Sequence, residues 1–136
     1  MLSSLDISTS ALVAQRTRLD AVASNIANMS TLRDENGDPQ PYESRFVIFQ
    51  TDDTLKTRNG AVGVKVASVE TSKHKPNLRH EPNHPLADEN GYVAYPHVNM
   101  TAEFVNALTA TRAYEANVGV IETTKAMGAQ TLRILA

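Results

Sequence analysis

The distribution of proline is the feature that most limits what this chain of 136 residues can fold into. All six prolines lie within residues 31–97, together with four of the six glycines. Because proline lacks a backbone N–H and clashes with the preceding helical turn, long helices are excluded from this central part. Only the two ends of the chain can form them.

The C-terminal segment, residues 98–136, has the spacing of one long helix. Alternating steps of four and three residues reach eleven positions, eight of them apolar. These positions are Met100, Phe104, Ala107, Thr111, Tyr114, Val118, Ile121, Lys125, Gly128, Leu132 and Leu135. So narrow a seam cannot be buried by the helix alone, so we expect it to lie against another long helix. The polar residues of this seam either fix the register of the helix pair or lie at the solvent-exposed edge of the seam. Gly119 and Gly128 indicate either close packing against a neighbour or a hinge.

The N-terminal segment, residues 1–30, supplies the other helix. Apolar residues recur every seven positions at Leu5, Leu12, Leu19 and Ile26, with alanines between them. We therefore expect a mainly α fold with a small β-rich insert. In it, the long N- and C-terminal helices pair as an antiparallel, coiled-coil-like hairpin.

The insert, residues 31–97, combines turn signals with short apolar stretches. Asp34–Gly37 and Asp88–Gly91 each contain Asn-Gly, a strong turn signal. Strands are predicted at residues 42–50, 62–69 and 92–95. Asn99 is a candidate N-cap for the helix that follows.

Composition excludes several function classes. The net charge is −2, and the charges of both terminal segments are balanced, so no basic stripe for nucleic acid is present. Cysteine is absent, which excludes thiolate chemistry. No apolar run is long enough to span a bilayer, and the N-terminus lacks the features of a cleaved signal peptide. We expect no cofactor and no membrane insertion.

One metal pattern competes with a structural function. His80–His84 matches H-E-x-x-H, in which two histidines one helical turn apart bind zinc and the glutamate acts as a base. Pro82 lies inside the pattern and Pro85 follows it, so a regular helix is not expected there. A zinc hydrolase using His80 and His84 is therefore only an alternative, and we otherwise predict no enzyme and no metal site.

A second pattern resembles the start of a calcium loop. Asp34, Asn36 and Asp38 have the right spacing, but Arg45 occupies the place of the closing glutamate. A turn is the better interpretation. Asn28 and Asn99 begin glycosylation sequons, but both lie at expected helix ends, where asparagine caps are common.

Four stretches resemble flagellar axial proteins. They are Ser24–Asn28, Thr111–Val118, His84–Val93 and Tyr95–Asn99. The resemblance runs from about Leu5 to the C-terminus, and the chain length fits the short, proximal rod proteins. It implies a structural subunit of the bacterial flagellar basal-body rod; another short flagellar rod subunit, or a helical adaptor with one partner, is the alternative.

The resemblance also implies how such a subunit works. It would be exported by the flagellar type III apparatus and would polymerise into a helical, torque-transmitting tube across the periplasm. The implied partners are other copies, other rod proteins, the rod-base adaptor, the MS ring and the export apparatus. The terminal helices would form the tube and be partly disordered in a monomer. The expected assembly contacts are Asn25, Asn28, Arg112, Tyr114, Glu115 and Asn117, with Tyr114 the strongest because it lies on the seam.

Overall fold

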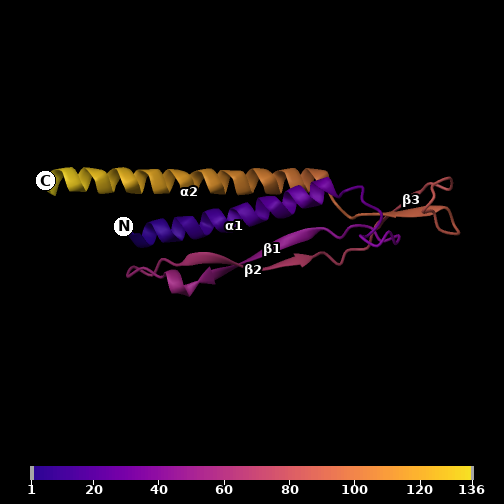
Figure 1. The fold of residues 1–136 in the computed structure, drawn as a ribbon, viewed down its shortest axis with the longest axis horizontal. Coiled ribbons are helices and arrows are strands. Elements are labelled where there is room, and N and C mark those ends of the chain that lie inside the picture. The colour runs from indigo at the N-terminus through magenta and orange to yellow at the C-terminus, as the bar shows by residue number, and fades with distance from the viewer. Residues whose placement is uncertain (1, 136) are drawn as a thin grey trace.

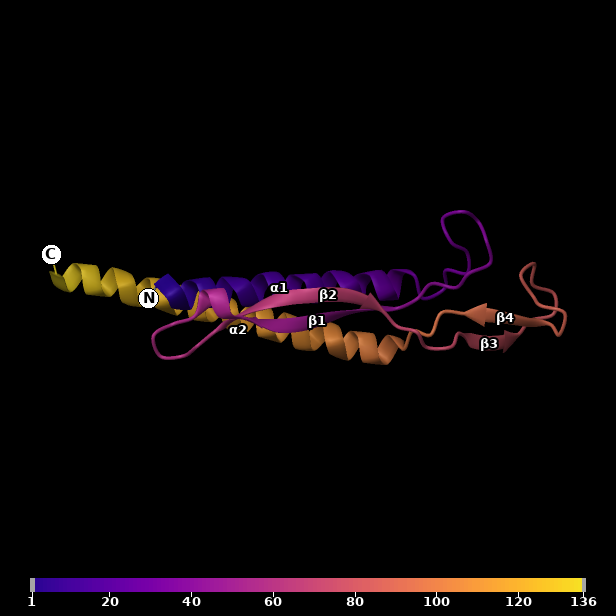
Figure 2. The same ribbon diagram turned by 90° about the horizontal axis from the view of Figure 1, so that it is seen from below.

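The computed structural model describes residues 2–135, with side chains from Ser4 onward, as an elongated molecule (Figure 1). Helix α1 lies between α2 on one side and the β1–β2 hairpin on the other (Figure 1). A second hairpin, β3–β4, extends beyond them at one end (Figure 2). The elements are α1 (Leu2–Ala27), β1 (Arg45–Asp52), the 3-10 helix η1 (Asp53–Leu55), β2 (Gly63–Thr71), β3 (Asn77–His80), β4 (Tyr92–Tyr95) and α2 (Met100–Leu135).

The two long terminal helices are confirmed, and they run antiparallel (Figure 1). Asn28 ends α1 by donating from its side-chain amide to the Ser24 carbonyl at 3.0 Å. Asn99 caps α2 by accepting from the Ala102 backbone N–H at 3.1 Å. Both sequon asparagines therefore have the helix-end role that the sequence predicted.

The β1–β2 hairpin runs back along α1 and turns alternate side chains toward it. In β2, Val64 and Val66 are half-buried while Lys65 is exposed, which is the predicted period of two. The register shifts between Ile48 and Phe49 of β1, so that β2 contributes one extra residue. The predicted strands at residues 42–50 and 62–69 are thus both present, displaced slightly along the chain.

The β3–β4 hairpin was only half predicted. Strand β4 has the predicted bounds, but β3 was missed because Asn-Leu-Arg-His contains one apolar residue and no alternation. β3 forms because it pairs with β4 in an antiparallel register that places Asn77 opposite Tyr95 and His80 opposite Tyr92. The cation of Arg79 also lies over the Tyr95 ring, 4.4 Å from its centre.

Very little of the molecule is buried. The buried apolar residues among those described are Ala14, Ala21, Val22, Val93 and Ala110. The accessible surface is 9623 Å², whereas a compact protein of this mass would expose about 7,000 Å². No helix within residues 2–135 is long and apolar enough to cross a membrane.

Candidate assembly surface

The two long helices are covered to opposite extents. On α1, exposed residues form only one narrow stripe, which includes Asp6, Val13 and Asp20, because α2 and the β1–β2 hairpin cover the rest. On α2 the pattern is reversed, and only one stripe is covered. The covered stripe comprises Glu103, Asn106, Ala107, Ala110, Ala113, Asn117, Val118, Gly119, Ile121, Thr124 and Gly128. Most of the surface of α2 is therefore open.

The contact between the helices differs from the predicted apolar seam. Ala110 is 0 % exposed at its centre, while the seam residues Phe104 and Leu132 are mostly exposed. The small alanines let the two backbones approach closely, which larger seam residues would prevent. One polar bond adds to the contact, since the Arg18 guanidinium donates to the Asn106 side-chain oxygen at 3.0 Å. Of the predicted seam, Ala107, Val118, Ile121 and Gly128 lie on the covered stripe, whereas the other seam residues are exposed. The predicted pairing of the helices is therefore confirmed, and the predicted seam is correct only in part.

The open part of α2 is strongly apolar. Its exposed large side chains include Phe104, Val105, Leu108, Val120, Met127, Leu132, Ile134 and Leu135. The last turns of α2 extend past the start of α1, and Leu135 there is 79 % exposed (Figure 1). Exposed apolar residues are common singly, but a helix covered with them marks an interaction surface.

A shallow groove of about 380 Å³ interrupts this surface, lined by Ala116, Gly119, Val120, Thr123 and Thr124. A Cβ built on Gly119 would meet no atom within 4 Å. Close packing against Gly119, one of the two sequence interpretations, is therefore not found within residues 2–135. The groove is instead open to another molecule.

The predicted assembly residues on α2 lie at different depths. Arg112 and Glu115, three residues apart on α2, form a surface ion pair of 3.0 Å, which contributes little to stability. Tyr114 is 38 % exposed, so part of its ring is available to a neighbour. The Asn117 amide donates to the Ala113 carbonyl at 2.8 Å and faces α1.

The two predicted residues on the first helix are engaged inside the chain. Asn25 lies in the last part of α1, where it is 1 % exposed. It binds the backbone of Arg45 at the start of β1. The Asn28 side chain accepts from the Thr31 hydroxyl at 3.1 Å. The partner of Asn25 could not be predicted from the sequence, because Arg45 lies across a long loop.

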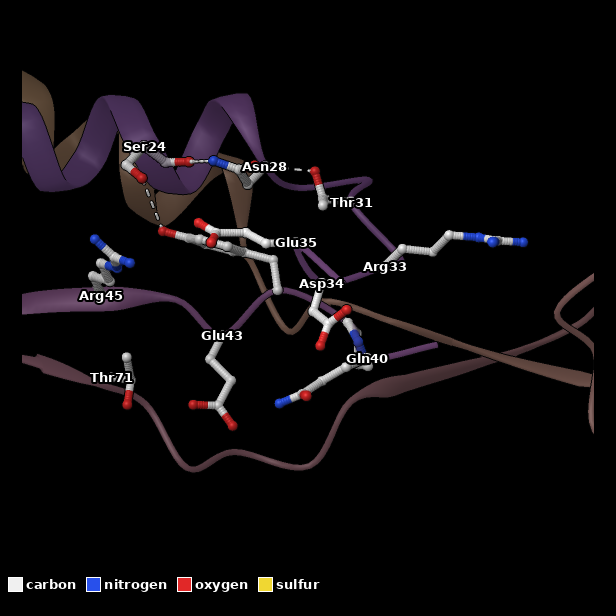
Figure 3. A pocket seen from close by; sticks show the side chains of 12 residues that line it. Ser24, Asn28, Thr31, Arg33, Asp34, Glu35, Gln40, Glu43, Arg45 and Thr71 are labelled. Atoms are coloured by element: carbon white, nitrogen blue, oxygen red, sulfur yellow. Dashed lines mark hydrogen bonds between the residues drawn. The ribbon is translucent and has the colours of Figure 1, made fainter. Parts of the chain in front are cut away.

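An open, polar cleft of about 410 Å³ lies beneath the end of α1 (Figure 3). Its upper wall contains Ser24, whose hydroxyl is hydrogen-bonded to that of Tyr42 at 3.0 Å (Figure 3). Asp34, Gln40 and Glu43 line the remainder, with Thr71 of β2 opposite. The cleft contains no histidine and no buried acid, so its geometry indicates a solvated junction.

The H-E-x-x-H pattern does not have the geometry of a zinc site. His80 is the last residue of β3 and His84 lies in the following turn, so they are not one helical turn apart. The Glu81 carboxylate accepts from the Tyr95 hydroxyl at 3.1 Å. Burial and this bond to Glu81 raise the pKa of Tyr95 above its usual 10.0. Among the described residues, no cluster of three potential metal ligands occurs.

The apparent calcium loop is a turn. One oxygen of Asp34 accepts from the backbone N–H groups of Asn36 and Asp38 at 3.0 and 2.8 Å. Asp88 makes the equivalent bonds to Asn90 and Tyr92 at 2.9 and 2.8 Å. Each of the two Asp-Glu-Asn-Gly stretches therefore forms a closed loop of the same kind. In each loop, backbone N–H groups of the loop already bind the aspartate carboxylate oxygen.

Two family models match the two ends of the chain. The family described as "Flagella basal body rod protein" matches residues 5–33, and "Flagellar basal body rod FlgEFG protein C-terminal" matches residues 89–134. These two matches cover the two long helices and the β4 hairpin strand.

Full-length relatives cover nearly the whole chain. The flagellar basal-body rod protein FlgC of Salmonella typhimurium is 44 % identical over 98 % of this chain and 97 % of its own length. FlgC of Escherichia coli O6:H1 is 42 % identical with the same coverage, and FlgC of Borreliella burgdorferi is 38 % identical over 99 % of this chain and 97 % of its own. The chain therefore belongs to the FlgC family of flagellar basal-body rod proteins.

Proposed function

We propose that this rod subunit assembles through the open face of α2. The observation that supports this most is the unequal covering of the two helices, since α1 has a single exposed stripe whereas α2 has a single covered one. Burying the exposed apolar side chains of α2 against neighbouring subunits would supply stabilisation that the small core of the isolated chain lacks, at about 25 cal/mol per Å².

The polymer we propose is a helical tube that transmits torque across the periplasm. Residues 1–30 and 98–136 form its core as a coiled-coil-like pair, and residues 31–97 make contacts outside the core. A surface on one copy that meets a different surface on the next generates an open helical array. One end of the molecule is the exposed, apolar C-terminal part of α2, and the other end is the β3–β4 hairpin. This difference between the two ends supports a contact between unlike surfaces.

The proposed partners are other copies of the chain, other rod proteins, the rod-base adaptor and the MS ring, with the flagellar type III apparatus exporting the subunit. Its role is structural rather than enzymatic. Two observations support this: the relatives are rod proteins, and the cleft beneath the end of α1 is an open polar junction. Tyr114, Arg112 and Glu115 are proposed contacts, because all three are accessible on α2.

A charge placed on the open face tests the proposal. Leu108→Glu should leave the monomer folded, because Leu108 is 60 % exposed, but it should block incorporation into rods by burying a carboxylate at the new contact. The measurement is swimming, and rod content of purified basal bodies, in a host whose own rod subunit gene is deleted.

Val13→Glu is the matched control. Val13 is 61 % exposed and lies on the stripe of α1. We expect this variant to swim. Normal rods from Leu108→Glu would contradict the proposal, and wild-type chain that stays monomeric with one bound partner at all concentrations would favour the adaptor.

A further inference from the structure

The β1–β2 hairpin is fastened to α1 by polar side chains at both of its ends. At one end, Asn25 binds Arg45, the first residue of β1. At the other end, the Ser10 hydroxyl accepts from the Val64 backbone N–H at 3.1 Å and donates to the Ile7 carbonyl at 2.6 Å. Ser10 and Asn25 are separated by about 22 Å along the helix axis. The hairpin is therefore held along most of α1.

Asn25 pairs with Arg45 as a neighbouring strand would. Its amide nitrogen donates to the Arg45 carbonyl at 2.8 Å, and its oxygen accepts from the Arg45 N–H at 2.7 Å. The same oxygen accepts from the Tyr42 hydroxyl at 3.0 Å. One buried side chain thus satisfies both backbone groups at the edge of the sheet, where they would otherwise lack partners.

These bonds close the long loop that reverses the chain. Asn25 and Arg45 are 20 residues apart in sequence, and closing a loop of that length is opposed by chain entropy. The Tyr42 hydroxyl, which is also hydrogen-bonded to Ser24, holds the final part of the loop against α1 (Figure 3). The end of the loop and the start of β1 are therefore set by one cluster.

The opposite end depends on close approach of the backbones. A Cβ at Gly63 would lie 3.0 Å from the Leu55 Cβ and 3.1 Å from the Ser10 hydroxyl oxygen. The missing side chain lets Val64 reach Ser10. With both ends fixed, the hairpin lies along the side of α1 opposite α2 (Figure 1).

We infer that Asn25 is a positioning residue for rod assembly, acting through the hairpin rather than by touching a neighbouring subunit. The inference rests on the proposed function, because assembly is what the positioned hairpin serves. It assigns the same role to Ser10 at the far end and to Tyr42 beside Asn25. A residue 1 % exposed in the monomer offers a neighbour almost no surface.

The first measurement is hydrogen exchange of the full-length monomer. Asn25→Ala should speed exchange of the Arg45 amide by about ten- to a hundredfold, because its acceptor is lost. Ser10→Ala should do the same at Val64. The controls are Asn117→Ala and Thr9→Ala, whose side chains bind only the helical turn on which they lie. Circular dichroism checks that every variant keeps its helices.

The second measurement is incorporation of the same variants into rods. Asn25→Ala and Ser10→Ala should both reduce rod formation by tenfold or more, although the two residues lie at opposite ends of the hairpin, whereas Thr9→Ala should not. Tyr42→Phe should give an intermediate loss in both measurements, because it removes one of the bonds to Asn25.

Two results would overturn the inference. One is loss of assembly in Asn25→Ala with unchanged exchange at Arg45, which would indicate a direct contact. The other is normal assembly despite fast exchange. Failure of the wild-type chain to enter rods would instead reject the proposed function, while the exchange measurement would still report whether Asn25 and Ser10 position the hairpin.

Discussion

At the scale of single residues, short polar side chains determine where this chain turns. Asn28 and Asn99 close two helix ends, and Asp34 and Asp88 close two loops of the same sequence. All four could be predicted, because each binds backbone within four residues of itself. Asn25 could not, because its partner Arg45 is separated from it by the whole reversing loop.

The two matching loops provide a controlled test of glycine strain. Gly91 has φ +78° and a Cβ there would lie 3.1 Å from the Pro82 Cβ, whereas Gly37 has φ +86° and open space. Gly37→Ala should cost about 1 kcal/mol of unfolding free energy from strain alone. Gly91→Ala should cost about 1 kcal/mol more, because Pro82 must also move. Urea unfolding of both variants measures the difference, and equal losses would contradict it.

Asp52 provides a test of pH dependence. A hydrogen bond from the Thr54 hydroxyl, together with one from its backbone N–H, lowers the pKa of Asp52 below its usual 3.8. Because the pKa of Asp52 is lower in the folded state, its carboxylate stabilises the fold at pH values above the ordinary pKa of aspartate. This contribution is lost as the pH falls through the folded-state pKa. Thr54→Ala should therefore raise the pKa of Asp52 toward 3.8.

Carboxyl-carbon NMR titration of Asp52 makes this measurement. Thr54→Ser, which keeps the hydroxyl bound to the Asp52 oxygen at 2.7 Å in the wild type, is the control and should titrate as the wild type does. An unchanged Asp52 titration in Thr54→Ala would show that the hydroxyl is not the main cause.

At the scale of elements, the sequence predicts which segments are helices and strands better than how they face each other. The absence of proline from both ends of the chain predicted the two long helices, and the alternation of apolar and polar residues predicted β2. The contact face of α2 was only partly predicted, because periodicity marks apolar stripes and α2 has apolar residues on several sides. The fully buried position is Ala110, which is too small to dominate such a pattern.

Two alanine substitutions on α2 separate its covered and open faces. Ala110→Leu should lose about 1 to 3 kcal/mol of unfolding free energy, because the contact with α1 has no room for the larger side chain. Ala116→Leu, which points into the open groove, should leave monomer stability nearly unchanged but reduce rod formation by filling the groove. Thermal unfolding and motility assays measure the two effects. Similar stability losses in both variants would contradict this assignment of faces.

At the scale of the whole molecule, this chain has too little core for its length. Its surface of 9623 Å² is well above that of a compact protein of its mass. Ten of the 16 exposed large apolar side chains among the described residues lie on α2, whose C-terminal end extends past α1 (Figure 1). We expect the stability of α2 to depend on neighbouring subunits, because most of its large apolar side chains are exposed in the isolated chain.

Hydrogen exchange tests this dependence directly. In dilute monomer, amides of the last two turns of α2 should exchange almost as fast as an unfolded peptide, since Leu132, Ile134 and Leu135 have no burial to hold them. In purified rods the same amides should be protected. Full protection in the monomer would show that the ends are stable without assembly.

The antiparallel helix pair has one further consequence. It places bare helix at one end of the molecule and the β3–β4 hairpin at the other (Figure 2). Copies stacked in a common orientation form a fibre whose two tips are chemically different, so an incoming subunit meets only one kind of acceptor at each tip. The direction in which such a fibre lengthens is thus already encoded in the asymmetry of a single subunit.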